Sequence, residues 1–417
     1  MNNFFKSVRA EKRTRSYLGI FSVAFALAGG MGLADAQEAM PATPPAMMMM
    51  PPMSPVSTPA MAGPLSANVA PLSLDLGPLG NKIYVTGAVT GLGFLQNDAT
   101  RFRGDNSSGL DLSNGQIFVQ KVDGLIQFYV QAGVYSIPAL GTPYLSMSRT
   151  MDETYGFVPQ AFLKIAPSDT FSIMAGKLPT LVGAEYTFTF ENMDIFRGLL
   201  WAQEPAVSRG VQVNYTIGPL ALSASLNDGY YSNRYNWLSG SAAWTIDMEN
   251  TVSVVGAGNF GHTGYSSFAT PLLQNNGSIF NLIFTHTAGP WTITPYVQYS
   301  QVSADKTIGI QHDASTTGVA LLASYGINDF IKLAGRVEYI DSSGKGATLA
   351  TSTNVLYGPG SSAWSFTITP TYQYNIFFAR AEYSYVTASS TTAGFAFGPT
   401  GTATSQSRFA VEGGVLF

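Results

Sequence analysis

The sequence predicts an all-β fold, a transmembrane antiparallel β-barrel, on the strength of three observations. Apolar residues make up 46% of the 417 residues and charged residues only 11%, against about a quarter in soluble domains. From Lys82 to Phe417 apolar and polar side chains alternate with the period of two that is typical of strands. Short and long connections also alternate along this region. After the first 36 residues, no apolar run approaches the roughly 20 residues that a membrane-spanning helix requires.

Residues 1–36 are expected to be a secretory signal peptide. A basic start with Lys6 and Arg15 at its ends precedes an apolar stretch, and Ala34-Asp35-Ala36 offers a small-x-small cleavage site. The alternative is a membrane anchor, but glycines weaken the end of the stretch. Cleavage would remove five of 21 basic and two of 25 acidic residues, leaving a net charge of about −7. A nucleic-acid partner is therefore not expected, and export to the bacterial outer membrane is.

Residues 37–80 are expected to form a Pro/Met/Ala-rich periplasmic linker that behaves as a disordered, extended tether. Seven methionines lie between residues 37 and 71. Thioethers favour Cu(I), so a soft-metal site is the alternative. No His or Cys accompanies these methionines, and we therefore expect neither a metal nor another cofactor. The absence of cysteine from the whole chain also excludes disulfides, a thiol nucleophile and a lipid-attachment site.

The barrel is predicted to span residues 81–417, and its strands are amphipathic. In one of them Val211, Val213 and Tyr215 alternate with Gln212 and Asn214. A soluble sandwich would bury the apolar face in a core, whereas a membrane barrel turns it to lipid and the polar face to the lumen. Alternation alone leaves both open, and the connections favour the barrel.

Connection lengths predict the strand number. Tight links are expected at 121–124, 166–169, 218–219, 247–250, 288–290, 327–329 and 375, and longer ones at 97–114, 137–156, 180–208, 229–234, 264–276, 304–313, 344–361 and 391–405. These links join sixteen strands of about 9 to 11 residues, with fourteen or eighteen as alternatives. An even number places both ends of the barrel on the side of the short turns. Sixteen strands leave an aqueous channel.

The last strand ends on an aromatic residue. Phe409, Val411, Val415 and Phe417 fall on one face, and the sequence stops at Phe417. This resembles the terminal strand of outer-membrane barrels, in which the final Phe is the signal read by the barrel-assembly machinery. We accordingly expect that machinery and outer-membrane lipid to be partners of the chain.

The longest connection, residues 180–208, is predicted to fold into the barrel and constrict the pore. Its apolar side chains are too numerous for a freely solvated loop and should pack against something; they are Phe188, Phe190, Phe196, Leu199, Leu200 and Trp201. The loop also holds four acids and one base, namely Glu185, Glu191, Asp194, Glu204 and Arg197. In a constriction this excess would favour cations. The alternative is that the acids only solvate an external loop.

Charged side chains on three late strands are expected to line the lumen. The alternation assigns these charges to the polar faces of three strands: Lys332, Arg336 and Glu338 to one, Arg380 and Glu382 to another, and Arg408 and Glu412 to the last. A charge on the lipid face costs about 2 to 4 kcal/mol, which places them inside. They could form a charge-balanced network that stiffens the wall, a row of charges along the path of permeating ions, or both.

Residues 176–240 resemble a known family. The segments GKLPTLVGAE (176–185), FEN (190–192), RG (197–198), SRGVQ (208–212) and GPLALSASLNDGYYSNRYNWLSG (218–240) are similar to the OmpL-like β-barrel porin-2 family. The resemblance implies an outer-membrane porin that lets small hydrophilic solutes or ions diffuse passively. A homotrimer is expected from this resemblance and from no single residue.

Rival functions have weaker support. A G-x-G-x-x-G pattern at residues 256–261 lacks the following helix and acidic residue of a dinucleotide site. A barrel hydrolase would have to use one of His262, His286 and His312, and no nucleophile elbow or H-E-x-x-H motif accompanies them. An adhesion or anchoring barrel would have a plugged lumen. We predict a protein that is not an enzyme.

Overall fold

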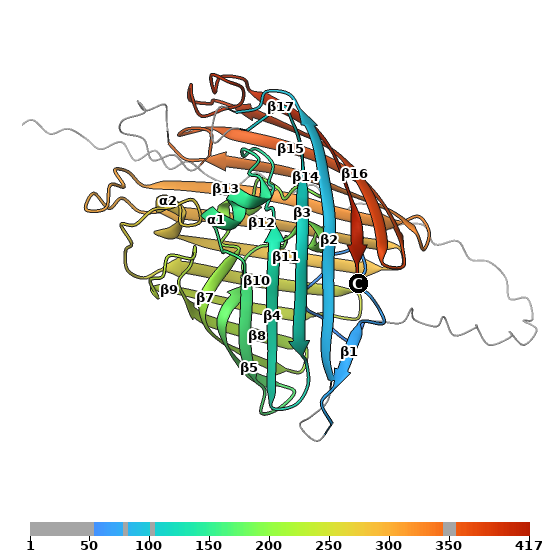
Figure 1. Cartoon of the computed structure of the whole chain (residues 1–417). Helices are drawn as coiled ribbons and strands as arrows, with labels where there is room; N and C mark the ends of the chain where they lie inside the picture. Colours follow the sequence, from blue (N-terminus) through green and yellow to red (C-terminus); the bar gives the residue numbers. More distant parts are fainter. Residues whose placement is uncertain (1–53, 78–81, 101–104, 345–355) are drawn as a thin grey trace, which may run out of the picture. The chain divides into compact units, whose positions relative to one another are not determined.

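The computed structural model describes residues 54–77, 82–100, 105–344 and 356–417. The predicted signal peptide and the part of the predicted linker that precedes residue 54 lie outside these residues. Seventeen strands form one sheet, and the sixteen from β2 to β17 close into an antiparallel barrel (Figure 1). Each strand pairs with the next along the chain, and β17 pairs with β2 to close the ring. The predicted sixteen-stranded barrel is confirmed.

The strands have the following bounds: β1 Leu72–Asp75, β2 Lys82–Gln96, β3 Ser108–Lys121, β4 Ile126–Tyr135, β5 Gln160–Ile165, β6 Phe171–Pro179, β7 Val207–Ile217, β8 Leu220–Asn227, β9 Trp237–Thr245, β10 Asn250–Asn259, β11 Gly277–Ala288, β12 Trp291–Val302, β13 Ala314–Gly326, β14 Ile331–Ser342, β15 Ser362–Tyr374, β16 Phe377–Ser389 and β17 Ser405–Leu416. Short helices lie in the connections: α1 Met147–Glu153, α2 Leu272–Asn275, and the 3₁₀ turns η3 Thr189–Glu191 and η4 Trp201–Gln203. No helix in the described part of the chain is both long and apolar enough to cross a membrane.

The predicted alternation of short and long connections is present. All short links lie at one end of the barrel, here called the short-turn end, and β2 begins and β17 ends there. The first long link is shorter than predicted, because β3 starts at Ser108. Leu110 and Leu112 continue the outward apolar row there, with Leu110 89% exposed.

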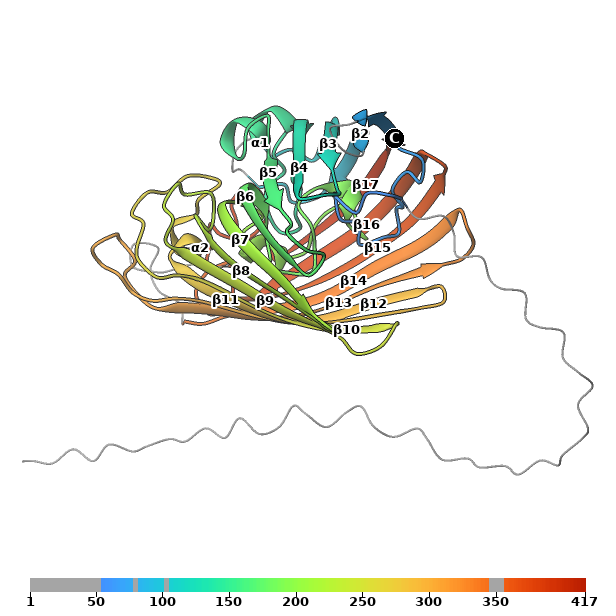
Figure 2. The ribbon, with the colours of Figure 1, turned by 90° about the horizontal axis from the view of Figure 1, so that it is seen from below.

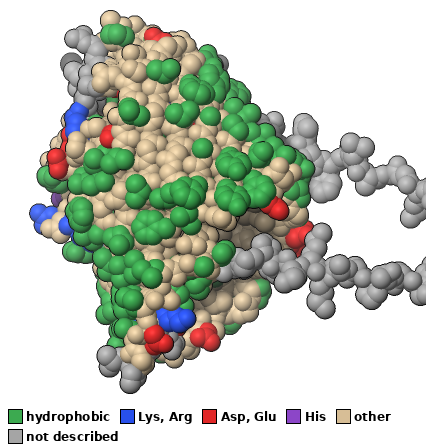
Figure 3. Space-filling model, turned by 45° about the vertical axis from the view of Figure 1, so that its right-hand side comes forward, with side chains coloured by type: hydrophobic (Ala, Val, Ile, Leu, Met, Phe, Trp, Pro, Cys, Tyr) green, Lys and Arg blue, Asp and Glu red, His purple; other side chains and the backbone are tan. Residues whose placement is uncertain are grey.

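The outer surface of the barrel is apolar. Val211, Val213 and Tyr215 of β7 are exposed, while Gln212 between them is buried. Figure 3 shows hydrophobic side chains spread over one side of the barrel, with its few charged side chains mainly near the margins of that view. The strands therefore turn their apolar face outward and their polar face inward, which is the arrangement of a barrel in lipid rather than of a soluble sandwich.

Residues 54–77 do not form the free tether predicted for residues 37–80. Strand β1 pairs with the start of β2, from Leu72 opposite Val85 to Asp75 opposite Lys82. The chain before β1 packs against residues of the barrel interior, and Leu65 is only 2% exposed. A Pro/Ala/Met composition gives no amphipathic period, so the sequence carried no signal for this packing.

Candidate channel constriction

The connection between β6 and β7 lies inside the barrel. We call residues 180–206 the inward loop, since β7 begins at Val207, two residues earlier than predicted. The apolar side chains singled out in the sequence fill the interior: Phe188, Phe190, Phe196, Leu199 and Leu200 are at most 2% exposed. Trp201 is partly buried and packs against the cluster that contains Phe188 and Phe190. These side chains are buried by the barrel wall, which explains why a loop can hold them.

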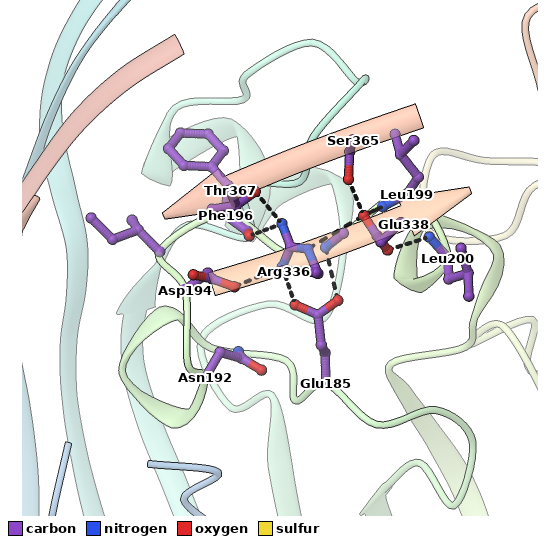
Figure 4. A network of polar contacts seen from close by, with 12 residues as sticks. Glu185, Asn192, Asp194, Phe196, Leu199, Leu200, Arg336, Glu338, Ser365 and Thr367 are labelled. Carbon is purple, nitrogen blue, oxygen red and sulfur yellow. Dashed lines mark hydrogen bonds and ion pairs between the residues drawn. The ribbon is translucent and has the colours of Figure 1, made fainter. Parts of the chain in front are cut away.

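Arg336 of β14 holds the loop by its carboxylates. Its guanidinium lies 2.5 Å from Glu185 Oε1 and 3.6 Å from Asp194 Oδ2 on the loop, and 3.3 Å from Glu338 Oε2 on its own strand. It also donates to the carbonyl of Phe196. Figure 4 shows Arg336 at the centre of these groups. Because the Arg336 side chain is fully buried, the three carboxylates provide the charge compensation that its burial requires.

Two wall carboxylates bind the backbone of the loop. Glu338 accepts hydrogen bonds from the amides of Leu199 and Leu200, at 2.9 and 3.2 Å (Figure 4). Glu382 of β16 accepts from the amides of Ile195 and Phe196, at 2.5 and 3.1 Å. Each carboxylate therefore satisfies two successive N–H groups that would otherwise be buried without partners. The alternation of apolar and polar positions predicted that these acids face the lumen. Nothing in the sequence indicated that they would accept hydrogen bonds from the backbone of the loop.

The last two strands hold the first part of the loop. Arg380 of β16 pairs with Glu412 of β17 at 2.6 Å and donates to the carbonyls of Thr189 and Asn192. Glu412 in turn accepts from the hydroxyl of Thr189 at 2.6 Å. Salt bridges and hydrogen bonds together thus fix the 3₁₀ turn η3 against the wall.

The remaining predicted lumen charges lie at opposite ends of the interior. Arg408 of β17 donates to Gln96 at 2.8 Å and stacks over the ring of Phe196 at 4.3 Å. Lys332, near the short-turn end of β14, donates to the carbonyl of Pro64 at 2.6 Å. All seven residues thus have their side chains inside the barrel, and six of them contact the inward loop or one another.

Two loop acids are held differently. Glu191 accepts from the amide of Phe188 at 2.9 Å, within the loop itself. Glu204 is 5% exposed, and its carboxylate oxygens have no hydrogen-bond partner among the described residues. The guanidinium of Arg197 lies over the ring of Trp201 at 4.8 Å. The structure therefore disperses the five loop charges, and only Glu185 and Asp194 share the same cation.

Burial changes the ionisation of the carboxyls on the loop, which are not on membrane-spanning strands. Desolvation raises the pKa of Glu191 to about 8, although hydrogen bonds from the loop backbone and the charge of Arg197 act in the opposite direction. Desolvation also raises the pKa of Glu185 to about 7, against the attraction of Arg336. At neutral pH part of the acidity of the loop is therefore masked by protons.

The inner wall of the barrel is unequal around its circumference. We call β14–β17 with β2 and β3 the clamped arc, because most of the polar contacts that hold the loop come from these strands. We call β7–β10 the open arc. Towards the short-turn end, its inward side chains are partly or fully accessible, among them Asn214, Ser223, Ser241 and Ser253. The charged residue on these four strands is Arg209, which pairs with Asp228 near the long-loop end of β7.

Polar residues that the sequence analysis did not single out also hold the inward loop. Asn114 of β3 donates to the hydroxyl of Thr189, Gln298 of β12 to the carbonyl of Leu200, and the amide of Gly183 to Asn281 of β11. Thr369 of β15 donates to Asp194 at 2.6 Å. The alternation along each strand predicts that these residues face inward. Polar inward-facing residues are general in such strands, so nothing in the sequence distinguished these residues from ones that face water.

Comparison with known proteins identifies the family. The model of the family described as "putative beta-barrel porin-2, OmpL-like" matches residues 82–417. The chain belongs to this family. It is therefore a porin of the bacterial outer membrane that acts as a passive channel, as the resemblance in residues 176–240 implied. No curated protein matches the chain.

Solved structures share the fold at low sequence identity. Outer-membrane expressed OmpT of Vibrio cholerae is 14% identical with a TM-score of 0.54, over 84% of this chain and all of that one. The outer membrane channel DcaP of Acinetobacter baumannii is 11% identical with a TM-score of 0.54, over 82% and 99%. An anion-selective porin from Comamonas acidovorans is 11% identical with a TM-score of 0.52, over 80% and 99%. These likenesses support the sixteen-stranded barrel and no more.

Proposed function

We propose that small hydrophilic solutes cross this porin along the open arc, between its Ser- and Asn-lined wall and the inward loop. One observation supports this path above all: inward side chains near the short-turn end are accessible on β7–β10, whereas most of their counterparts on the clamped arc, such as Gln120 and Thr371, are buried. A polar, uncharged wall opposite a charged loop resembles a sieve that selects by size first and by charge second. The loop then acts as the constriction.

We further propose a preference for cations. Around the inward loop lie seven buried carboxyl groups and four guanidinium groups. The acids are Glu185, Glu191, Asp194, Glu204, Glu338, Glu382 and Glu412, and the bases are Arg197, Arg336, Arg380 and Arg408. An excess of carboxylates in a region of low dielectric constant raises the local concentration of cations. Burial raises the pKa of Glu191, Glu204 and Glu185, so proton binding to these groups reduces the excess at neutral pH and the expected preference is small.

Purified protein in a planar bilayer tests the proposal. The wild type should show ohmic conductance steps and a reversal potential on the cation side in a salt gradient. Replacing Ser241 by Arg should narrow the path and add a positive charge to the open arc. The conductance should fall by roughly a quarter or more, and the reversal potential should move towards anions.

A matched variant separates the path from a general charge effect. Ser168 lies exposed in the short turn between β5 and β6, and Ser168→Arg adds the same side chain outside the proposed path. Its conductance should equal that of the wild type. Absence of conductance steps in the wild type would refute the porin assignment, and equal behaviour of the two arginine variants would refute the path.

We propose that the protein has no catalytic activity. The imidazole of His262 lies 3.9 Å from Asp305 near the long-loop end, whereas that of His286 contacts Asn250 near the short-turn end. Neither contact includes a serine. Among the described residues no group of His, Asp and Glu side chains could hold a metal ion. An adhesion or anchoring role would require the inward loop and residues 54–66 to close the lumen completely, and the absence of conductance steps would favour it. Assembly into homotrimers stays a prediction that cross-linking in native membranes would test.

A further inference from the structure

A segment that precedes the barrel in the sequence lies within its short-turn end. Residues 54–66, here called the lumen segment, come before β1 and are described as part of the same compact unit as the barrel. In Figure 2 the blue coil of this region lies beside the inner faces of the late strands. Val56 and Leu65 are 6% and 2% exposed, which is unusual for a Pro- and Ala-rich stretch with no secondary structure.

Side chains from separate strands bind the backbone of the lumen segment. Gln120 at the end of β3 donates to the carbonyl of Thr58 at 2.6 Å. Lys332 at the start of β14 donates to the carbonyl of Pro64 at 2.6 Å. Because β2, β17, β16 and β15 lie between β3 and β14 in the ring, the segment crosses the interior of the clamped arc.

A third contact lies at Ser66, the last residue of the lumen segment. The side chain of Gln373 on β15 accepts from the amide of Ser66 at 2.8 Å and donates to its carbonyl at 2.9 Å. This reciprocal pair imitates the pairing of two strands and uses both polar groups of the glutamine. A chance contact of a flexible tail would not satisfy its backbone in this way.

The lumen segment also contacts the inward loop. The amide of Ala62 donates to the carbonyl of Glu191 at 2.7 Å. Met61 and Leu65 pack in the hydrophobic cluster that contains Phe188 and Phe190 of the loop, and Ala62 packs against the cluster that contains Phe196. The segment thus lies between the loop and the short-turn end, and it covers apolar side chains of the loop that water would otherwise reach.

We infer that the lumen segment is an intramolecular support of the constriction: it holds the inward loop from the short-turn side and restricts the channel there. The expected effect of the segment on conductance rests on the proposed function. Its expected effect on the loop rests only on the contacts described above. Removing the segment would expose the cluster of Phe188 and Phe190 and free one side of the loop. The loop would then sample wider positions, and more of the lumen would conduct.

Deletion of residues 54–66 tests the effect on the channel. A matched deletion of residues 40–52 shortens the chain equally and removes none of these contacts. In planar bilayers the first deletion should raise the single-channel conductance at least about twofold and increase current noise. The second should match the wild type. Equal conductance of all three proteins would overturn the inference, as would a rise of the same size in both deletions.

Thiol labelling tests the contacts without any conductance. The chain has no cysteine, so single cysteines report on single sites. Leu65→Cys in the lumen segment should react with a water-soluble maleimide at least about tenfold more slowly than Ser168→Cys in the exposed short turn between β5 and β6. Equal labelling rates would show that the segment does not occupy the lumen, and would overturn the inference.

A loop cysteine distinguishes failure of this inference from failure of the proposed function. Thr189→Cys replaces a fully buried loop residue by one of similar size. Its labelling should accelerate about tenfold when residues 54–66 are deleted and stay unchanged when residues 40–52 are deleted. If the wild type did not conduct, the proposed function would fail and this comparison would still decide whether the segment supports the loop. Heat-modifiable migration in gels confirms that each variant is folded.

Discussion

The clamped arc and the open arc have the same backbone architecture and different interiors. In both, apolar residues face outward and polar residues inward with the period of two. On the clamped arc the inward residues include Arg336, Glu338, Arg380, Glu382 and Glu412, all buried beneath the inward loop. On the open arc the inward residues near the short-turn end are uncharged, and most of them are small. The comparison teaches that charged residues predicted to face the lumen need not line the path of a solute. They can instead hold a loop against the wall.

Loss of the central cation should have the largest effect. Replacing Arg336 by Leu leaves Glu185, Asp194 and Glu338 close together without their shared positive charge. Removing one partner of a buried ion pair costs about 3 to 5 kcal/mol. We expect the heat-modifiability midpoint in gels to fall and the conductance to become noisy. Arg336→Lys keeps the charge and should lose less. Wild-type behaviour of Arg336→Leu would show that the clamp does not depend on this group.

Neutralising the loop acids should have the next largest effect. In the double variant Glu191→Gln, Asp194→Asn, the hydrogen bonds from Phe188 and Thr369 are weakened, and the charge of Asp194 is lost together with the charge that Glu191 carries above its pKa of about 8. We expect a stability loss of about 1 to 3 kcal/mol and a reversal potential shifted away from cation preference. An unchanged reversal potential would exclude these two acids as determinants of selectivity and leave them a structural role.

A matched pair of hydroxyl deletions compares the arcs directly. Thr369→Val removes the donor to Asp194 on the clamped arc, and Ser223→Ala removes the donor to Asn214 on the open arc. The first leaves a buried carboxylate oxygen without its partner, at a cost of about 1 to 3 kcal/mol. The second leaves an amide that water can reach, at a cost of about 0.5 to 1 kcal/mol. Unfolding in denaturant would measure both, and equal losses would contradict the proposed distinction.

pH should produce the smallest effect. Burial raises the pKa of Glu185 to about 7 and of Glu191 to about 8, so both lose protons between pH 6 and 9. The loop then gains negative charge, and the cation preference in bilayers should increase over this interval. Because these folded-state values exceed the ordinary pKa near 4.5, the unfolded chain ionises first, and stability should fall as pH rises towards them. Glu191→Gln should weaken both dependences, and an increase in stability over this interval would contradict the sign.

The sequence alone determined the barrel, because lipid imposes a local rule on every strand. A residue such as Val211 must face outward and Gln212 inward, so orientation follows from position in the chain, and strand number follows from counting turns. The same rule placed Arg336, Arg380 and Arg408 inside. The apolar content of residues 180–206 likewise indicated that this connection packs against something.

Only the tertiary structure decided what those interior residues do. The contact of Arg336 with Glu185 joins groups 151 residues apart, and no periodicity predicts such a pairing. The packing of residues 54–66 escaped prediction for the same reason: the segment has no pattern of its own, and its hydrogen-bond partners, Gln120, Lys332 and Gln373, become neighbours only when the barrel closes. Local sequence thus fixed the wall, and ring closure decided what lies inside it.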